Sequence, residues 1–289
     1  MDKMETNNMF EKAPTVLSKG KYLEIVVKLT LQDDAIIRSN DAEEVLTYKY
    51  KDLGNRFIIP WRKIKGKLRR LVMEKQRGLG IEPNCHLKDD LCMTCPSCFI
   101  FGGTGETSKA KVPYNLLSRI MGETFISLTE TKEIEPYTQN AVDEVRLDTR
   151  REGSSTGALM SILTVPAETE FIGVITLRDP TLEMASIVID NIGRLTRLGA
   201  RSVEWGKAKA DILGYKFSDR ETMYSIELAK ANGEVNGLTK SLNDLPMVDA
   251  AYKTLNDAVK KELAAKGLKA EKSEKGKEKE PEDVVAEEA

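Results

Sequence analysis

The stretch Tyr22–Leu31, close to the start of the chain, alternates between apolar and polar side chains. A period of two residues is the pattern of a β-strand, because successive side chains point to opposite faces of a sheet. The pattern therefore predicts a strand with one buried face, and a sheet that other elements must cover on that side. The apolar set is Leu23, Ile25, Val27, Leu29 and Leu31.

Five further segments have the composition and period of regular elements. The order along the chain is strand, helix, strand, strand, helix, strand, which is the βαββαβ pattern of ferredoxin-like folds. We therefore predict an α+β fold with a modified ferredoxin-like core, carrying a metal-binding insertion and a protruding arm. The helices are expected at residues 61–76 and 181–198, and the later strands at 124–131, 170–177 and 207–213.

The remaining segments divide the chain into three parts. Residues 1–20 are expected to be a flexible N-terminus, and residues 21–252 the folded core. Within the core, the insertion spans 78–107 and the polar, turn-rich arm spans 133–165. Residues 253–289 are expected to hold a short helix and then a disordered tail rich in Lys and Glu, because that composition offers almost nothing apolar to bury.

All of the cysteines lie within one short segment, so they cannot form the distributed disulfide framework of a secreted domain. Four thiolates satisfy tetrahedral Zn²⁺, and their close spacing suits a structural site. We predict a zinc site, with an iron–sulfur cluster or free structural thiols as the alternatives. The four residues are Cys85, Cys92, Cys95 and Cys98.

The chain has a single histidine, His86, directly beside Cys85. It could replace one thiolate at the metal, although adjacent residues rarely bind one ion. Without a second histidine, catalysis by a histidine pair is excluded, and a Ser-His-Asp hydrolase would have to use His86 inside the metal loop.

A run of positive charge stands out against a net charge of −2. The positive side chains fall on the expected helix that follows Pro60, with no acidic residue before Glu74. Such a run can be merely a solvated surface, but without acidic partners and at a helix entrance it favours contact with phosphates. The residues are Arg62, Lys63, Lys65, Lys67, Arg69 and Arg70.

Two other segments bear on nucleotide chemistry. Arg146, Arg150 and Arg151 are either ordinary loop surface or, on an arm with few carboxylates, contacts to an RNA backbone or a stacked base. The glycine-rich residues 102–109 do not match a phosphate-binding P-loop, because Lys109 follows serine rather than glycine.

The chain has no apolar run of the roughly 20 residues that cross a bilayer, and residues 1–19 lack the apolar core of a secretory signal. We therefore expect a cytoplasmic protein with no membrane partner.

Several segments resemble a known superfamily when taken in order. Residues 57–69 (FIIPWRKIKGKLR) resemble the strand-to-helix signature of the repeat-associated mysterious protein superfamily. Residues 95–102 (CPSCFIFG) look like the cysteine and Phe-Gly segment that follows that helix, and residues 199–206 look like its glycine-containing loop. With the cysteine-bearing insertion, the chain looks most like the backbone subunit of a type I-D CRISPR complex.

The resemblance implies a modified RNA-recognition-motif fold and a non-catalytic role in an antiviral interference complex. Several copies of the subunit would stack along one guide RNA (crRNA), together with other subunits of the complex, and leave its bases free to pair with target DNA. The family motif falls on Lys65 and Arg69, which become the expected phosphate contacts, and Arg201 of the glycine-containing loop joins them.

Two alternatives remain open at this stage. Type III relatives cleave target RNA with an aspartate in the loop after the first strand, so Asp33, Asp34 and Asp41 are weak candidates for a metal-dependent endoribonuclease. Their loop lacks the Gly-Gly-Ile-Asp setting expected there. The other alternative is a zinc-containing single-strand-binding module with no role in CRISPR.

Overall fold

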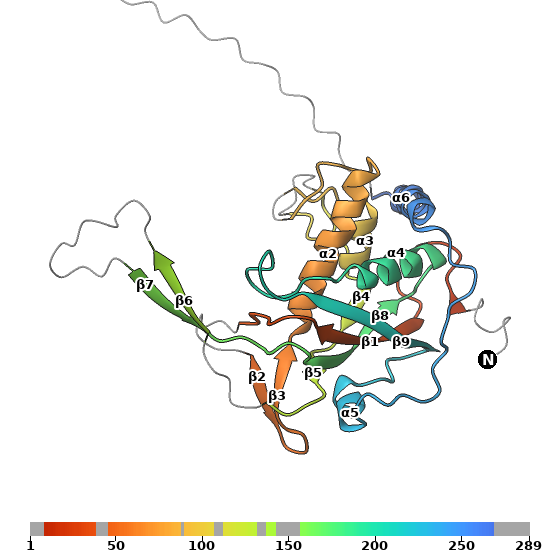
Figure 1. Cartoon of the computed structure of the whole chain (residues 1–289). Helices are drawn as coiled ribbons and strands as arrows, with labels where there is room; N and C mark the ends of the chain where they lie inside the picture. The colour runs from red at the N-terminus through yellow and green to blue at the C-terminus, as the bar shows by residue number, and fades with distance from the viewer. Residues whose placement is uncertain are drawn as a thin grey trace, which may run out of the picture.

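A mixed α+β architecture surrounds one antiparallel sheet in the computed structural model of the chain (Figure 1). No helix among the described residues is long and apolar enough to cross a membrane. The structure describes residues 9–38, 46–87, 90–106, 112–131, 137–142 and 157–268, of which 137–142 and 157–161 are described by backbone alone.

The centre of the sheet is β1 (Tyr22–Leu31), which pairs antiparallel with β8 (Glu170–Arg178) and with β9 (Ala208–Ser218). The strand order is β2-β3-β5-β8-β1-β9, and β4 pairs with β8 beside that path. All four strands expected from the sequence are therefore present. The strand expected at residues 124–131 is β5 (Phe125–Ser127). The sheet also contains β2 (Thr47–Tyr50), β3 (Gly54–Ile59) and β4 (Ile120–Gly122).

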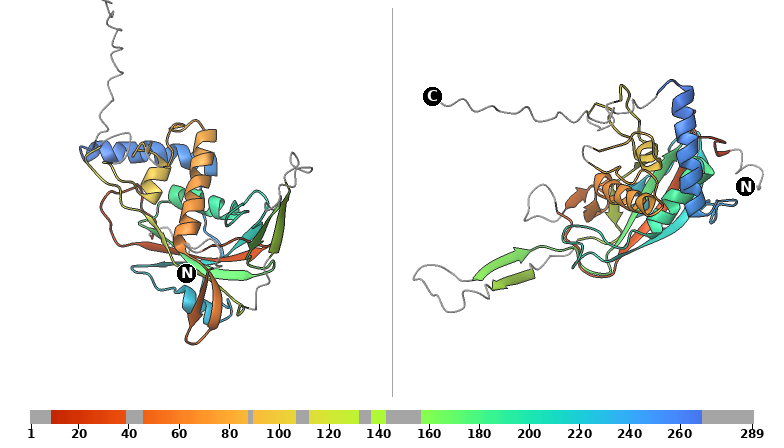
Figure 2. Two further views of the ribbon diagram at one scale, coloured as in Figure 1. Left: turned by 90° about the vertical axis from the view of Figure 1, so that its left-hand side faces the viewer. Right: turned by 90° about the horizontal axis from the view of Figure 1, so that it is seen from above.

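Helices cover one face of this sheet (Figure 2). Ile64 and Leu68 of α2 lie in the same buried cluster as Leu23 and Ile25 of β1. The start of α4 is fixed by Thr181, whose hydroxyl accepts a hydrogen bond from the backbone N–H of Met184 at 3.2 Å, as expected for an N-cap. The helices on this face are α2 (Trp61–Gly78), α3 (Pro96–Phe101), α4 (Leu182–Gly193) and α6 (Val248–Ala265).

The opposite face of the sheet is also covered, which the alternation of β1 did not predict. A second buried cluster joins Val26 of β1 and Val174 of β8 to Leu228 of α5 (Ser225–Lys230). Glu24, expected at the solvent, is fully buried, because its carboxylate accepts hydrogen bonds from the backbone N–H groups of Thr222 at 2.7 Å and Met223 at 2.8 Å. The prediction of one buried face was therefore wrong.

The C-terminal helix α6 begins before the short helix expected from residue 253 and is an integral part of the core. Its Tyr252 is fully buried, and burial raises the pKa of this phenol. The Tyr252 hydroxyl accepts a hydrogen bond from Asn191 Nδ2 of α4 at 3.0 Å and donates one to the Val72 carbonyl of α2 at 3.3 Å. One side chain thus connects three helices.

Strands β6 (Tyr137–Val142) and β7 (Gly157–Ile162) pair antiparallel with each other and form a sheet of their own. Figures 1 and 2 show this ribbon extending away from the main sheet. It lies within the expected arm, whereas Arg146, Arg150 and Arg151 fall outside the described residues.

Candidate nucleic-acid interface and metal site

Helix α2 divides its positive side chains between two flanks, where the sequence had indicated a single basic face. Its apolar stripe, including Ile64, Leu68 and Val72, is buried. With 3.6 residues per turn, side chains that precede and follow this stripe leave the helix in different directions. One flank carries Lys63, Lys67 and Arg70, and the other carries Lys65 and Arg69.

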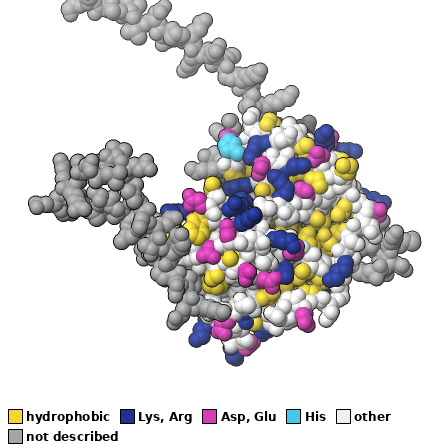
Figure 3. All heavy atoms as spheres, viewed as in Figure 1, with side chains coloured by type: hydrophobic (Ala, Val, Ile, Leu, Met, Phe, Trp, Pro, Cys, Tyr) yellow, Lys and Arg dark blue, Asp and Glu magenta, His cyan; other side chains and the backbone are white. Residues whose placement is uncertain are grey.

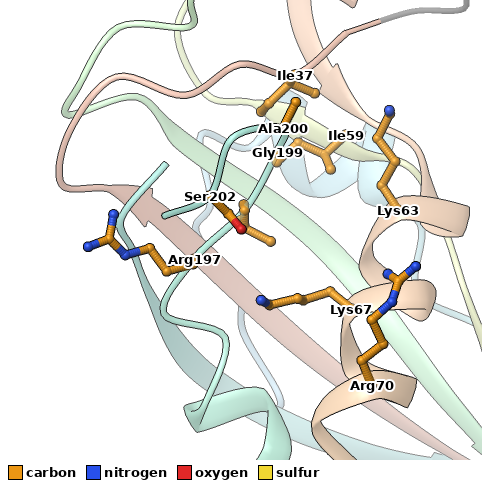
Figure 4. A pocket seen from close by; sticks show the side chains of 10 residues that line it. Ile37, Ile59, Lys63, Lys67, Arg70, Arg197, Gly199, Ala200 and Ser202 are labelled. Carbon is orange, nitrogen blue, oxygen red and sulfur yellow. The ribbon is translucent and has the colours of Figure 1, made fainter. Parts of the chain in front are cut away.

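The first flank forms one wall of a cavity of about 480 Å³, which we name the basic cavity. Figure 4 shows Lys67 pointing across it toward the loop that carries Ser202, with Arg197 on the opposite wall. Four of its ten lining residues are cationic, and none of these ten described residues is acidic. The lining residues are Ile37, Ile59, Lys63, Lys67, Arg70, Arg197, Leu198, Gly199, Ala200 and Ser202.

The basic cavity concentrates positive charge, and no acidic side chain lines it in the part of the chain that the structure describes. Burial, and then the neighbouring charge of Arg62, lower the pKa of Lys63. Arg197 Nη1 is buried and has no hydrogen-bond partner in the described part of the chain. An anion in the cavity would favour the charged form of Lys63, because an opposite charge offsets the cost of burial and the repulsion from Arg62. Figure 3 shows Lys and Arg side chains on the face of the molecule that is viewed in Figure 1, interspersed with Asp and Glu.

The loop that closes the cavity is held by close backbone contacts. Gly199 and Gly206 both have positive φ angles, of 85° and 74°. A Cβ atom at Gly199 would lie 2.6 Å from the Ile36 carbonyl oxygen, and one at Gly206 would lie 1.9 Å from that of Leu198. Only glycine tolerates both the positive φ angle and the close carbonyl oxygen. Arg201 lies exposed in this loop and does not line the cavity.

The aspartates after β1 hold these loops together. Asp33 Oδ1 accepts a hydrogen bond from the backbone N–H of Lys207 at 2.6 Å. Asp34 accepts one from the Thr164 hydroxyl at 2.9 Å and one from the backbone N–H of Ala167 at 3.0 Å. Asp41 lies outside the described residues. The two described carboxylates therefore have structural partners.

On the second flank of α2, Lys65 donates a hydrogen bond from Nζ to Ser118 Oγ at 3.0 Å. The Arg69 guanidinium lies over the Phe101 ring, 6.0 Å from its centre. Glycines 102, 103 and 105 allow this wall to form, because a Cβ at Gly102 would lie 2.7 Å from the Leu116 carbonyl oxygen. The glycine run thus serves close packing rather than a nucleotide phosphate.

The four cysteines converge as the sequence predicts. Their sulfur atoms all lie within 4.8 Å of one another, and Cys85 Sγ is 3.6 Å from both Cys95 Sγ and Cys98 Sγ. Four sulfurs at about 2.3 Å from a tetrahedral ion are about 3.8 Å apart, so this arrangement fits a metal ion. Cys95 also caps α3, since its sulfur accepts a hydrogen bond from the backbone N–H of Cys98.

The sulfur atoms influence one another strongly. A hydrogen bond from Cys85 lowers the pKa of Cys92, whereas burial raises that of Cys95. Four protonated thiols so close together compete for the same space, and a cation at the centre would favour the thiolate forms.

His86 is directed away from the sulfur cluster, and more than half of its side chain is exposed. Its Nε2 is 3.1 Å from Asp90 Oδ2, and its Nδ1 is 2.9 Å from the Asn84 carbonyl oxygen. The group of four sulfur atoms that could hold a metal ion does not include His86.

The sequence analysis missed one cavity residue, Arg197, and did not group Arg70 with Lys63 and Lys67. Arg70 follows Lys63 by seven positions and Lys67 by three, so a helical projection of the sequence would have grouped them. Arg197 comes from the loop after α4 and carries no signal in the sequence, because only the tertiary fold brings it opposite α2.

Comparison with known proteins finds solved structures with a similar fold and one matching family. The crystal structure of Thermofilum pendens Csc2 matches with a TM-score of 0.55 and 18% identity, over 93% of this chain and 86% of that chain. A chain of a Type IV-B CRISPR complex matches with a TM-score of 0.51 and 16% identity, over 78% of this chain and 96% of that one. No curated protein matches. The family model Csc2 Crispr matches residues 7–287.

The molecule is a backbone subunit of a CRISPR interference complex, of the repeat-associated mysterious protein class. The chain belongs to the Csc2 family, the backbone subunits of type I-D complexes.

The structural role of Asp34 can be tested directly. Asp34→Ala leaves the buried Thr164 hydroxyl and the Ala167 N–H without an acceptor, so it should lower the free energy of unfolding by about 1–3 kcal/mol. Asp219→Ala, at an exposed residue paired only locally with Arg220, should change it by less than about 0.5 kcal/mol. Urea unfolding measures both. An unchanged stability with loss of RNA cleavage would instead assign Asp34 to a ribonuclease site.

Proposed function

We propose that this subunit binds guide RNA through its phosphates, without reading its sequence, at the basic cavity beside α2. The observation that carries the proposal is that Lys63, Lys67, Arg70 and Arg197 line one cavity whose lining contains no acidic residue among those described. Phosphate contacts position a nucleic acid but carry no sequence information. The bases then remain available to pair with target DNA, and pairing supplies the specificity.

We also propose that the sheet is a modified ferredoxin-like, RNA-recognition-motif core. The order β5-β8-β1-β9, with α2 and α4 in the two crossovers, supports this assignment. In such domains the open sheet face commonly holds RNA. Here α5 and the residues around it cover that face, which favours the basic cavity as the place for the guide.

Further RNA contacts complete the proposal. Residues of α2 outside the cavity, the exposed Arg201 and the arginines of the arm would extend the phosphate path along the surface. The additional residues are Arg62, Lys65, Arg69, Arg146, Arg150, Arg151 and Arg201.

Neutralising the cavity should weaken RNA binding uniformly. In the double variant Lys67→Ala/Arg70→Ala, the slope of log affinity against log salt should fall by about 0.7 for each phosphate that the protein no longer neutralises, equally for RNAs of unrelated sequence. Lys230→Ala, which removes a cation paired with Asp52 on α5, is the matched control. Fluorescence anisotropy at several salt concentrations measures the effect. If both variants bind RNA with equal affinity, the positive side chains of α2 are only a solvated surface and do not contact RNA.

The role that we propose is non-catalytic. Asp33 and Asp34, the described candidates for a ribonuclease, are engaged by backbone and hydroxyl donors that link the loops. These hydrogen bonds give both aspartates a structural role, so no catalytic role is needed to explain why they stand there. The subunit then acts by holding the guide.

We further propose that Cys85, Cys92, Cys95 and Cys98 hold one structural Zn²⁺. The sulfur separations and the burial of three of the four residues support a closed four-thiolate site. The ion would supply a cross-link that secures α3 in a segment with little regular structure. Through α3, the same cross-link supports the wall formed by residues 101–103, because the Gly102 N–H donates to the Cys98 carbonyl at 2.9 Å.

Metal analysis tests this site. The purified protein should contain about one zinc per chain, and Cys98→Ser should lower both the zinc content and the thermal midpoint, because a structural ion contributes directly to folding. His86→Ala should retain the zinc, since His86 is paired with Asp90. A folded, metal-free protein, or one with the visible absorbance of an iron–sulfur cluster, would disprove the zinc assignment.

Assembly on the guide is the last part of the proposal. One domain of this size contacts only a few nucleotides, so covering a guide requires several copies, alongside other subunits of the complex. The β6–β7 ribbon extends from the main sheet and is suited to reach across to a neighbouring copy.

Removing the arm should separate assembly from folding. Replacing residues 138–156 by a short Gly/Ser linker should leave the main sheet intact, because β6 and β7 pair only with each other among the described strands. RNA-dependent multimers should disappear. Size-exclusion chromatography with light scattering, with and without a guide-length RNA, measures this. If the intact protein stays monomeric on RNA at full occupancy, the proposed assembly of several copies through the arm is refuted.

A further inference from the structure

The buried amide of Gln76 lies where the last turn of α2 meets the cysteine-bearing segment. Gln76 is fully buried, which is unfavourable for a polar side chain unless it forms hydrogen bonds. Its Oε1 accepts a hydrogen bond from the backbone N–H of Ser97 at 3.2 Å. Because Ser97 lies on α3 between Cys95 and Cys98, this bond joins α2 to the cysteine cluster.

The same bond completes the pairing of the first turn of α3. The first N–H groups of a helix have no partner inside it. Pro96 carries no N–H, and the Cys98 N–H donates to Cys95 Sγ at 3.4 Å. The Ser97 N–H lies between them in the chain, and its acceptor is Gln76. A side chain from another helix therefore fixes the turn that places Cys95 and Cys98.

The backbone of Gln76 acts on the other part of the cysteine cluster. Its carbonyl oxygen accepts hydrogen bonds from the N–H groups of Leu79 at 3.2 Å and of Ile81 at 3.1 Å. These bonds end α2 and begin the segment that leads to Cys85. One residue thus contacts the chain on both sides of the cluster. Its side chain holds the turn at 95–98, and its carbonyl holds the start of the path to Cys85.

Groups that lie just outside the ligands of a metal orient those ligands, and their loss typically lowers metal affinity about 10–100-fold. Gln76 is well suited to such a task because its helix is firmly held. Val72 and Met73, on the preceding turn of α2, lie in the same buried cluster as Cys95 and Cys98. The acceptor is therefore fixed in place before an ion binds, and the sulfurs of this turn need little further ordering.

We propose that Gln76 is a positioning residue of the metal site, which holds the first turn of α3 so that Cys95 and Cys98 present their sulfurs to one ion. The inference rests on the proposed four-thiolate zinc site and adds a residue beyond its ligands. Gln76 acts through the cysteines, since the ion would be bound by sulfur alone. It also joins the metal site to α2, the helix that carries Lys67 and Arg70 of the basic cavity.

Zinc and cobalt binding to the full-length protein test this role. Gln76→Met removes the acceptor but keeps a side chain of similar length, so it should raise the zinc dissociation constant about 10–100-fold in competition with a chromogenic chelator. The visible absorption bands of bound Co²⁺ should also change, because they report the geometry of the sulfurs around the ion. Asn191→Leu is the matched control, since it removes a buried amide that is bonded to Tyr252 instead. It should lower stability and leave both metal measurements unchanged.

The outcomes separate this role from the zinc site on which it rests. If Gln76→Met keeps the parent zinc affinity and Co²⁺ bands, the role of Gln76 is refuted while the zinc site stands. An equal loss of zinc affinity in Asn191→Leu would refute it too, since the effect would then be one of general stability. Amide hydrogen exchange in the unaltered protein needs no variant to fold: the Ser97 N–H should exchange slowly, and rapid exchange would show that no acceptor holds it. If the parent protein binds no metal, both proposals fail.

Discussion

The burial of one apolar stripe of α2 is the contact on which the functional geometry depends. Ile64 and Leu68 lie in the same buried cluster as the central strand β1. Because a helix is rigid and turns once in 3.6 residues, fixing this stripe fixes the direction of every other side chain on it. Lys67 must then leave on one flank and Arg69 on the other. The sequence places these cations close together, whereas the packing separates them onto two flanks.

Both flanks of α2 also lie beside backbone segments that approach each other more closely than any side chain allows. Gly199 fits against the Ile36 carbonyl beside the basic cavity, and Gly102 fits against the Leu116 carbonyl near Arg69. The second contact continues the cysteine cluster, since the Gly102 N–H is bonded to the Cys98 carbonyl. The cysteine cluster is therefore connected through α3 to the residues that pack beside Arg69.

The sequence patterns predicted helices and strands well where the buried residues recur at the regular spacing of a helix or a strand. The alternation of Tyr22–Leu31 gave a strand with those bounds, and the basic helix begins at Trp61, directly after Pro60. The same logic failed for Glu24, because a segment about 200 positions later covers the second face and supplies backbone donors to the carboxylate. It also missed the start of α6, whose apolar residues make sense only against α4.

By itself, the sequence determined the antiparallel strands, the two main helices, the four clustered cysteines and the family to which the chain belongs. These features depend on short-range spacing or on the order of motifs. Only the tertiary structure decided that Arg197 and Lys67 line the same cavity, that Asp33 and Asp34 are held as structural acceptors, and that α5 covers the second face of the sheet. Each of these contacts joins residues distant in the chain, and no local period encodes which distant segment a side chain will meet.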